Sequence, residues 1–264
     1  MKRVVIIGAG NVATHLGRAL QNKNFVVSQI FSRTENSATQ LASDLGVPFT
    51  TNLQSLDREA DIYFYCVKDA VLCDVINKID IPDALHVHTA GSLPLSIFES
   101  HLQYRRYGVF YPLQTFSKTR KVNFDEIPIF VEGNSLEAEE EIRQIAQTLS
   151  KRVFSSDSEQ RKKIHLSAVF ACNFVNHLFS IAEELVKTAG YSFDILLPLI
   201  TETVNKLSEL SPYDAQTGPA VRNDQNIIRQ HLLLLENKPE FSEIYSVLSE
   251  SIYRMHKKDI QTRE

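Results

Sequence analysis

The first 20 residues constrain the fold of this chain more than any other stretch, because they place a strand, a glycine turn and a helix in direct succession. The run from Val4 to Ile7 is β-branched throughout, which is typical of a strand buried on both faces. A turn of small residues follows, and from Asn11 to Leu20 the apolar residues recur with a helical period. This succession predicts the opening βαβ unit of a parallel sheet.

The turn carries the spacing Gly8-x-Gly10-x-x-Ala13, the dinucleotide-binding fingerprint with alanine in its third position. In that motif the first glycine makes the turn, the second lets a pyrophosphate approach the backbone, and Ala13 allows close helix packing. The phosphates would meet free N–H groups of Asn11, Val12 and Ala13 at the helix N-terminus. We therefore expect a nucleotide site here. The alternative is a glycine turn that only packs the sheet.

The end of the second expected strand, residues 25–31, indicates which dinucleotide is bound. An NAD enzyme usually has Asp or Glu at this point, where it bonds the ribose 2′-hydroxyl. This chain has Ser32, Arg33 and Thr34 instead. A guanidinium pairs with a 2′-phosphate, and the two hydroxyls can donate to it. The sequence favours NADP(H) over NAD, unless Arg33 is an ordinary solvated loop residue.

Further strands and helices alternate up to about residue 155. The backbone of Cys66, Val67 and Lys68 follows a buried strand and is expected near the nicotinamide-side ribose. Ser92, in the glycine loop after a later strand, is a candidate substrate contact. The predicted fold is an α/β, doubly wound, mostly parallel sheet, with later strands at residues 47–49, 61–67, 85–89, 107–116, 127–132 and 152–155.

Beyond residue 155 the pattern is helical to the end of the chain, so we expect a Rossmann domain over 1–155 and an all-α domain over 156–264. Its first helix, residues 161–190, is apolar almost all round and is expected to be buried on most sides. At 100° per residue its polar side chains fall into one stripe. We expect this stripe to line a pocket facing the cofactor, although a solvent-exposed edge or a partner chain would also satisfy it. Its members are Lys162, His165, Asn173, Asn176, Ser180 and Glu183.

Composition narrows the partners and the compartment. The chain has 28 Lys and Arg against 32 Asp and Glu, a formal charge of −4, so we expect no nucleic-acid partner. Its three cysteines are scattered, so neither a disulfide framework nor a metal site is expected. No apolar run reaches the roughly 20 residues of a membrane span, and the chain enters a strand at once, without a signal peptide. These features predict a soluble, cytoplasmic protein with no membrane partner.

Four stretches together resemble a known family, the Rossmann-like NADP oxidoreductases with a helical C-terminal domain of unknown function. The match extends over nearly the whole chain, and its middle motifs are more specific than the glycine fingerprint. The family often has serine at Ala90 and histidine at Tyr111, so this chain departs from its pattern at both positions. The four stretches are GAGNVA at 8–13, HTAGS at 88–92, FYPLQTF at 110–116 and TGPAVRND at 217–224.

More distantly, the layout is similar to 6-phosphogluconate dehydrogenase, ketopantoate reductase and pyrroline-5-carboxylate reductase. In that superfamily the first long helix of the C-terminal domain offers Lys, His or Asn to the substrate, and the helical domains often pair. The resemblance therefore implies a dehydrogenase or reductase that forms a homodimer through its helical domain. It names no substrate.

These observations predict hydride transfer between NADPH and a small carbonyl or imine compound, in a cleft between the two domains. His165 is the candidate acid/base, because an imidazole titrates near neutral pH, and Lys162 is its rival. Asn173 would hold the acceptor oxygen or orient the imidazole, while Asn176 and Arg222 would bind substrate, the arginine by clamping a carboxylate. The alternatives are a protein that senses NADP(H) without turnover and a structural protein with an empty site.

Overall fold

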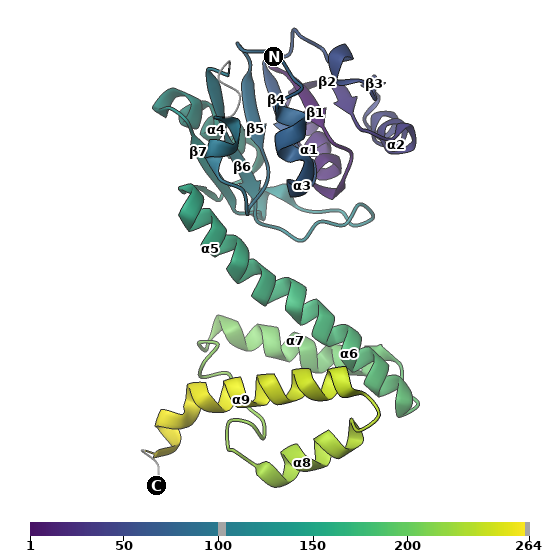
Figure 1. The fold of residues 1–264 in the computed structure, drawn as a ribbon, viewed down its shortest axis with the longest axis vertical. Helices are drawn as coiled ribbons and strands as arrows, with labels where there is room; N and C mark the ends of the chain where they lie inside the picture. The colour runs from purple at the N-terminus through teal and green to yellow at the C-terminus, as the bar shows by residue number, and fades with distance from the viewer. Residues whose placement is uncertain (100–103, 262–264) are drawn as a thin grey trace. The chain divides into compact units, whose positions relative to one another are not determined.

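The computed structural model describes residues 1–99 and 104–261 (Figure 1). The chain divides into two compact units, Met1–Phe174 and Val175–Glu264. After residue 155 the alternation of strands and helices gives way to helices alone. The boundary between the two compact units lies 19 residues later, after Phe174, within a long helix.

A single sheet of eight strands forms the centre of the first unit, in the order β3-β2-β1-β4-β5-β6-β7-β8. All neighbours are parallel except β6 and β7, so the last two strands run opposite to the others. The order 3-2-1-4-5-6 is that of dinucleotide-binding domains, and the predicted fold class is confirmed. The strands are β1 (Arg3–Ile7), β2 (Val26–Phe31), β3 (Phe49–Thr50), β4 (Ile62–Tyr65), β5 (Leu85–His88), β6 (Arg106–Pro112), β7 (Ile129–Gly133) and β8 (Val153–Ser155).

Helices cover both faces of this sheet, as the alternation of side chains along β1 requires. Val4 and Ile6 belong to a core closed by α1, α2 and α4, whereas Val5 and Ile7 belong to a second core closed by α3 and η2. All four side chains are fully buried, and burial of each stabilises the fold by about 1.5–3 kcal/mol. The helices are α1 (Asn11–Asn22), α2 (Glu35–Leu45), α3 (Asp69–Ile76) and α4 (Leu136–Leu149), with the short turns η1 (Leu53–Ser55), η2 (Leu95–Phe98) and η3 (Phe124–Glu126).

The chain changes direction across the sheet at β1, which pairs with β2 on one side and β4 on the other. Ligands of such sheets bind at the carboxyl ends of the strands beside this switch point. Gly8 leaves β1 there with φ +125°, and a Cβ on it would lie 2.3 Å from the carbonyl oxygen of Cys66. Only glycine fits both the backbone conformation and the space.

One continuous helix runs through α5 (Ser158–Ala168), η4 (Val169–Phe174) and α6 (Val175–Thr188). It begins three residues before the predicted start, because Asp157 and Gln160 form a capping box. The prediction that it is buried on most sides is wrong for the single chain, since Leu166 and Phe170 are more than half exposed. Arg161 is the buried residue of α5.

The η4 segment is π-helical, with more residues per turn than an α-helix. The 100° repeat assumed for the polar stripe therefore fails from Val169 onward, and the phases calculated for Asn176, Ser180 and Glu183 do not hold. A stripe extrapolated through six π-helical residues loses its register.

By length and composition, the helix Ser158–Thr188 could cross a membrane, with a mean hydropathy of 1.4 over its most apolar window. This differs from the expectation that no run of that kind is present. Core helices of soluble proteins pass the same test, so the finding is weak evidence for a membrane span.

The second unit consists of helices whose large apolar side chains are widely exposed. Examples are Leu199, Val204, Leu234 and Val247, each more than 60% exposed in the single chain. After α6 the unit contains η5 (Phe193–Leu196), α7 (Leu197–Asn205), η6 (Lys206–Ser208), α8 (Gln225–Leu234) and α9 (Pro239–Gln261).

Candidate functional site

A pocket of about 350 Å³ opens at the switch point of the sheet, beside the glycine turn. It brings together residues from the ends of β1, β2 and β4 that are far apart in the sequence. Three cationic side chains, Arg33, Lys68 and Lys118, contribute to its wall. The residues predicted for the cofactor that line it are Gly8, Gly10, Ser32, Arg33, Thr34, Cys66, Val67 and Lys68.

The N-terminus of α1 meets the requirements of a phosphate cradle. Its first intrahelical bond runs from the Thr14 N–H to the Gly10 carbonyl at 3.0 Å, so the N–H groups of the three preceding residues lie outside the helical ladder. No side chain caps them, and the first turn contains no acid. A Cβ on Gly10 would meet nothing within 4 Å, so the space in front of these groups is open. This arrangement fits a diphosphate.

The turn between β2 and α2, where the sequence predicts the 2′-phosphate to bind, forms another part of the pocket wall. Ser32 is half-buried, whereas Arg33 and Thr34 are exposed. The nearest acid in sequence, Glu35, begins α2 and does not line the pocket. The wall therefore offers a guanidinium and hydroxyls, and no carboxylate that would repel a 2′-phosphate.

Lys118 was not predicted from the sequence, because it lies in the loop between β6 and β7, far from the fingerprint. Two hydrogen bonds hold that loop on α1: Asn11 Nδ2 donates to the Phe116 carbonyl at 2.8 Å, and His15 Nε2 lies 2.9 Å from the Ser117 carbonyl. The His15 ring also stacks on Phe116 at 5.1 Å. The side chain of Asn11 thus positions Lys118, in addition to the backbone role predicted for it.

The residues that follow β4 connect the pocket to the loop after β5. Cys66 directly follows β4 and its side chain is buried, and this burial raises the pKa of its thiol to about 12. Lys68 is the N-cap of α3, and the Asp69 carboxylate beside it accepts a hydrogen bond from the Ser92 hydroxyl. Ser92, the predicted substrate contact, is therefore bonded to the residue that directly follows Lys68 of the pocket wall.

A tyrosine–histidine pair lies against this same loop. Tyr111 is the next-to-last residue of β6, and its hydroxyl lies 3.0 Å from Nδ1 of His165 on α5. A Cβ on Gly91 would lie 2.6 Å from the Tyr111 ring and 2.8 Å from that nitrogen, so the loop packs directly on the pair. Burial raises the pKa of Tyr111 to about 12, so its hydroxyl stays protonated at neutral pH. The loop that contains Gly91, the end of β6 and helix α5, which are distant in sequence, therefore meet at this point.

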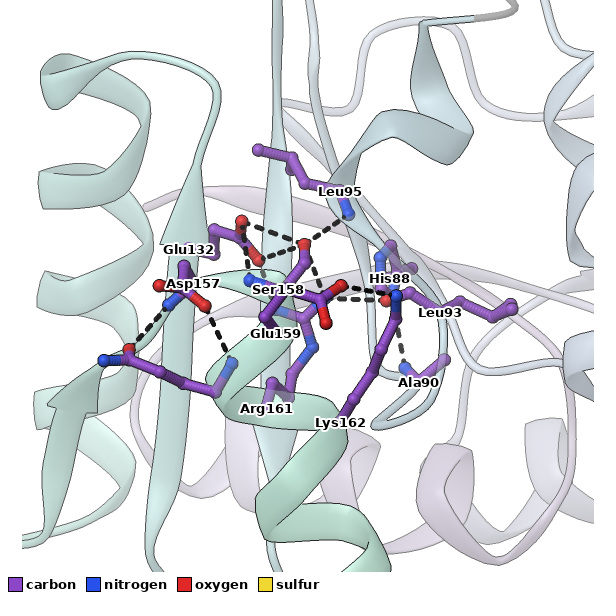
Figure 2. A network of polar contacts seen from close by, with 11 residues as sticks. His88, Ala90, Leu93, Leu95, Glu132, Asp157, Ser158, Glu159, Arg161 and Lys162 are labelled. Atoms are coloured by element: carbon purple, nitrogen blue, oxygen red, sulfur yellow. Dashed lines mark hydrogen bonds and ion pairs between the residues drawn. The ribbon is translucent and has the colours of Figure 1, made fainter.

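The first turn of α5 is fixed to the sheet by a buried ionic network (Figure 2). Arg161 is fully buried, pairs with Glu132 of β7 and donates to the Leu93 carbonyl at 2.6 Å. Ser158 donates to the same carboxylate at 3.0 Å and accepts the Leu95 N–H at 2.9 Å. Since His165 follows Arg161 by one helical turn, this network places the imidazole against Tyr111.

Among the residues that the structure describes, neither Lys162 nor Asn173, the other predicted catalytic residues of the first unit, forms a hydrogen bond with this pair. Lys162 makes an ion pair with Glu159 on its own helix at 2.7 Å, as Figure 2 shows. Asn173 is exposed on the π-helical segment, and Asn176 and Arg222 are exposed residues of the second unit. Among the described residues no group of three His, Cys, Asp or Glu could hold a metal ion.

Two segments of the chain match known family models. Residues 3–89 match the model described as NADP oxidoreductase coenzyme F420-dependent, and residues 127–252 match a domain of unknown function, DUF2520. A comparison with curated proteins finds no match.

Solved structures of similar proteins cover nearly the whole chain. A Bacteroides fragilis protein assigned as an NADP oxidoreductase is 47% identical, with a TM-score of 0.90 over 96% of this chain and 98% of that one. A 1-pyrroline-5-carboxylate reductase from Streptococcus pyogenes is 15% identical, with a TM-score of 0.64 over 97% and 98%. A reductive aminase from Aspergillus terreus, in complex with NADPH and ethyl-5-oxohexanoate, is 14% identical, with a TM-score of 0.66 over 99% and 94%. The last two show the shared fold.

Proposed function

We propose that this chain, which belongs to the family of NADP oxidoreductases with a DUF2520 domain, reduces a small carbonyl or imine compound with NADPH. The single observation that carries the proposal is that adjoining residues of the first unit connect the pocket at the glycine turn to the Tyr111–His165 pair. The strand ends lead from the phosphate cradle through Lys68, Asp69 and Ser92 to the loop that packs on Tyr111 and His165.

The residues of the pocket fit NADP(H) in chemistry and in space. The α1 N-terminus would hold the diphosphate, and Arg33, Ser32 and Thr34 would bind the 2′-phosphate. NADPH, when bound, supplies the hydride. The chain itself must hold the acceptor and supply one proton to its oxygen or nitrogen.

His165 is proposed to supply that proton, with Tyr111 fixing its tautomer. The imidazole can act as the acid only in its protonated form, in which both nitrogens donate: Nδ1–H to the oxygen of the Tyr111 hydroxyl and Nε2–H to the acceptor. As the hydride is transferred, the Nε2 proton would pass to the acceptor, and the neutral ring would keep its remaining proton on Nδ1, bonded to the Tyr111 hydroxyl, whose pKa burial raises to about 12. The hydroxyl thereby takes the orienting role first considered for Asn173, and the amide remains a candidate for holding the acceptor oxygen.

The substrate class rests on chemistry shared with similar proteins. The names of the two fold relatives specify reduction of C=N bonds, in a cyclic imine and in amination of a carbonyl. One hydride source and one acid/base group are sufficient for either a C=O or a C=N acceptor. Substrate contacts by Ser92, Asn176 and Arg222, and a location of the site between the two domains, remain predictions.

A spectrophotometric screen tests the proposal. Oxidation of NADPH at neutral pH is followed against keto acids, aldehydes and cyclic imines, and we expect saturable turnover with at least one class. With that substrate, His165→Ala should lower kcat about 100-fold and Tyr111→Phe about 10-fold. Lys162→Ala and the matched control His177→Ala, an exposed histidine on α6, should stay within about threefold of wild type. A fall of about 100-fold in kcat for Lys162→Ala, with an unchanged kcat for His165→Ala, would instead assign the acid/base role to the lysine.

We also infer that the chain acts as a homodimer through its helical unit. The support is the exposed apolar surface of that unit, exemplified by Leu199, Leu233, Leu234 and Val247, which a second copy would cover. Light scattering coupled to size-exclusion chromatography should give about twice the 30.0 kDa chain mass. A monomer at micromolar concentration would refute this inference.

A further inference from the structure

A second pocket, of about 680 Å³, lies against the loop that carries Lys118. It is bounded by α1 and by the segment from Lys118 to Asp125, between β6 and β7. Lys118 lines both pockets, whereas none of the predicted cofactor residues lines this one. Its size is that of a small-molecule site.

The wall of this pocket is strongly basic and only partly neutralised. Arg18 is paired with Asp44 at 3.1 Å, and Lys23 lies 3.8 Å from the Asp125 carboxylate. The side chains of Lys118, Arg120 and Lys121, which also line the pocket, make no ion pair with any residue in the described ranges 1–99 and 104–261. Three unneutralised cations thus border one cavity in a chain whose formal charge is −4.

The basic segment is held in place on both sides of the cations. Before them, Phe116 stacks on the buried ring of His15 and also, at 6.1 Å, on Phe124. Within the segment the Arg120 N–H donates to the Ser117 carbonyl at 3.1 Å, which closes a turn. The cations are therefore carried by an anchored loop, and their mutual repulsion cannot be relieved by moving the whole segment into solvent.

We propose that this pocket binds a small molecule with a multiply charged phosphate group, at a site distinct from the cofactor site. Such an anion neutralises all three cations at once and accepts charge-assisted hydrogen bonds from them. Because Lys118 borders both pockets, occupancy of one changes the electrostatic environment of the other. The two sites are coupled, and by linkage the coupling is reciprocal.

The test uses inorganic pyrophosphate as the probe and the full chain saturated with NADPH. Isothermal titration should show one further saturable event. The event should weaken at least about tenfold in the Arg120→Gln/Lys121→Gln variant, as loss of two charge-assisted contacts requires. The matched control Lys78→Gln/Lys163→Gln removes the same charge from exposed lysines of the first unit and should bind as wild type. Lys118→Gln should weaken both pyrophosphate and NADPH.

A second measurement does not depend on the variants. In wild-type protein carrying NADPH, pyrophosphate should shift the amide resonances of residues 118–124 and leave those of residues 8–13 in place. Loss of pyrophosphate binding when NADPH is saturating would assign the pocket to the cofactor site and overturn the proposal. Equal weakening in the control variant would overturn it too. A failure of NADPH to bind would refute the proposed function instead, and the titration would then be read on the protein without cofactor.

Discussion

The glycine-turn pocket and the long helix Ser158–Thr188 differ in what holds their groups in place. At the pocket beside the glycine turn, backbone geometry holds the groups in place. Gly8 is confined by the carbonyl of Cys66, and Gly10 leaves open space in front of the α1 N-terminus. On the helix, placement depends on side chains from elsewhere, since Arg161 is anchored by Glu132 and the Leu93 carbonyl. A site defined by backbone is encoded locally, whereas one defined by side-chain partners depends on the fold.

Substitution of the two glycines in the turn should have the largest effects, and the two effects should differ in kind. Gly8→Ala adds a Cβ at φ +125° and 2.3 Å from a carbonyl oxygen, so we expect it to cost about 4 kcal/mol of unfolding free energy or more. Gly10→Ala meets no atom within 4 Å and should leave stability within about 0.5 kcal/mol of wild type. It should nevertheless weaken NADPH binding about 100-fold, because its methyl group occupies the phosphate approach. Denaturant unfolding and NADPH titration of both variants check this. If Gly10→Ala lost stability as well as NADPH affinity, the two glycines would not have the separate roles assigned to them.

The helix anchor should respond to the loss of a charge. Glu132→Gln leaves the fully buried guanidinium of Arg161 without its counter-ion, and we expect a loss of about 3–5 kcal/mol in unfolding free energy. Glu159→Gln, which breaks the exposed pair with Lys162, is the matched control and should cost less than about 1 kcal/mol. Urea unfolding at neutral pH compares them. Similar values for the two would mean that α5 is not held by the buried network.

Acid should weaken the first unit through His88. Burial lowers the pKa of this imidazole from 6.5 to about 3, so it is neutral when folded and charged when unfolded between those values. The unfolded state then binds one more proton, and stability falls by about 1.4 kcal/mol per pH unit as pH drops from about 6.5. His88→Gln should remove this share of the pH dependence. Unfolding curves from pH 7 to pH 4 measure it, and an unchanged slope in the variant would contradict the account.

The smallest effect concerns the thiols. Burial raises the pKa of Cys66 to about 12, whereas Cys73 and Cys172 are exposed. We expect a thiol reagent at pH 8 to modify the two exposed cysteines rapidly and Cys66 only after denaturation. Rapid modification of all three would show that the strand end beside the glycine turn opens readily.

The parts of this molecule that could be predicted are those encoded by local spacing. The pattern at 8–13 and the absence of an acid at Ser32 to Thr34 specified the pocket, because a turn and a helix terminus need only neighbouring residues. The π-helical turn at Val169–Phe174 has no such signature, so the phase of Asn176 was misjudged. Tyr111 and Lys118 were missed as site residues because each reaches its site through contacts with elements distant in sequence.

The most direct test of the central claim is a comparison of NADPH and NADH binding to wild-type protein and to Arg33→Ala. We expect NADPH to bind at least about tenfold more tightly, as one charge-assisted contact to a 2′-phosphate implies, and this preference to vanish in the variant. Equal affinity of the wild-type protein for the two dinucleotides, or a preference that survives in Arg33→Ala, would contradict the assignment of this pocket to the cofactor's adenosine end.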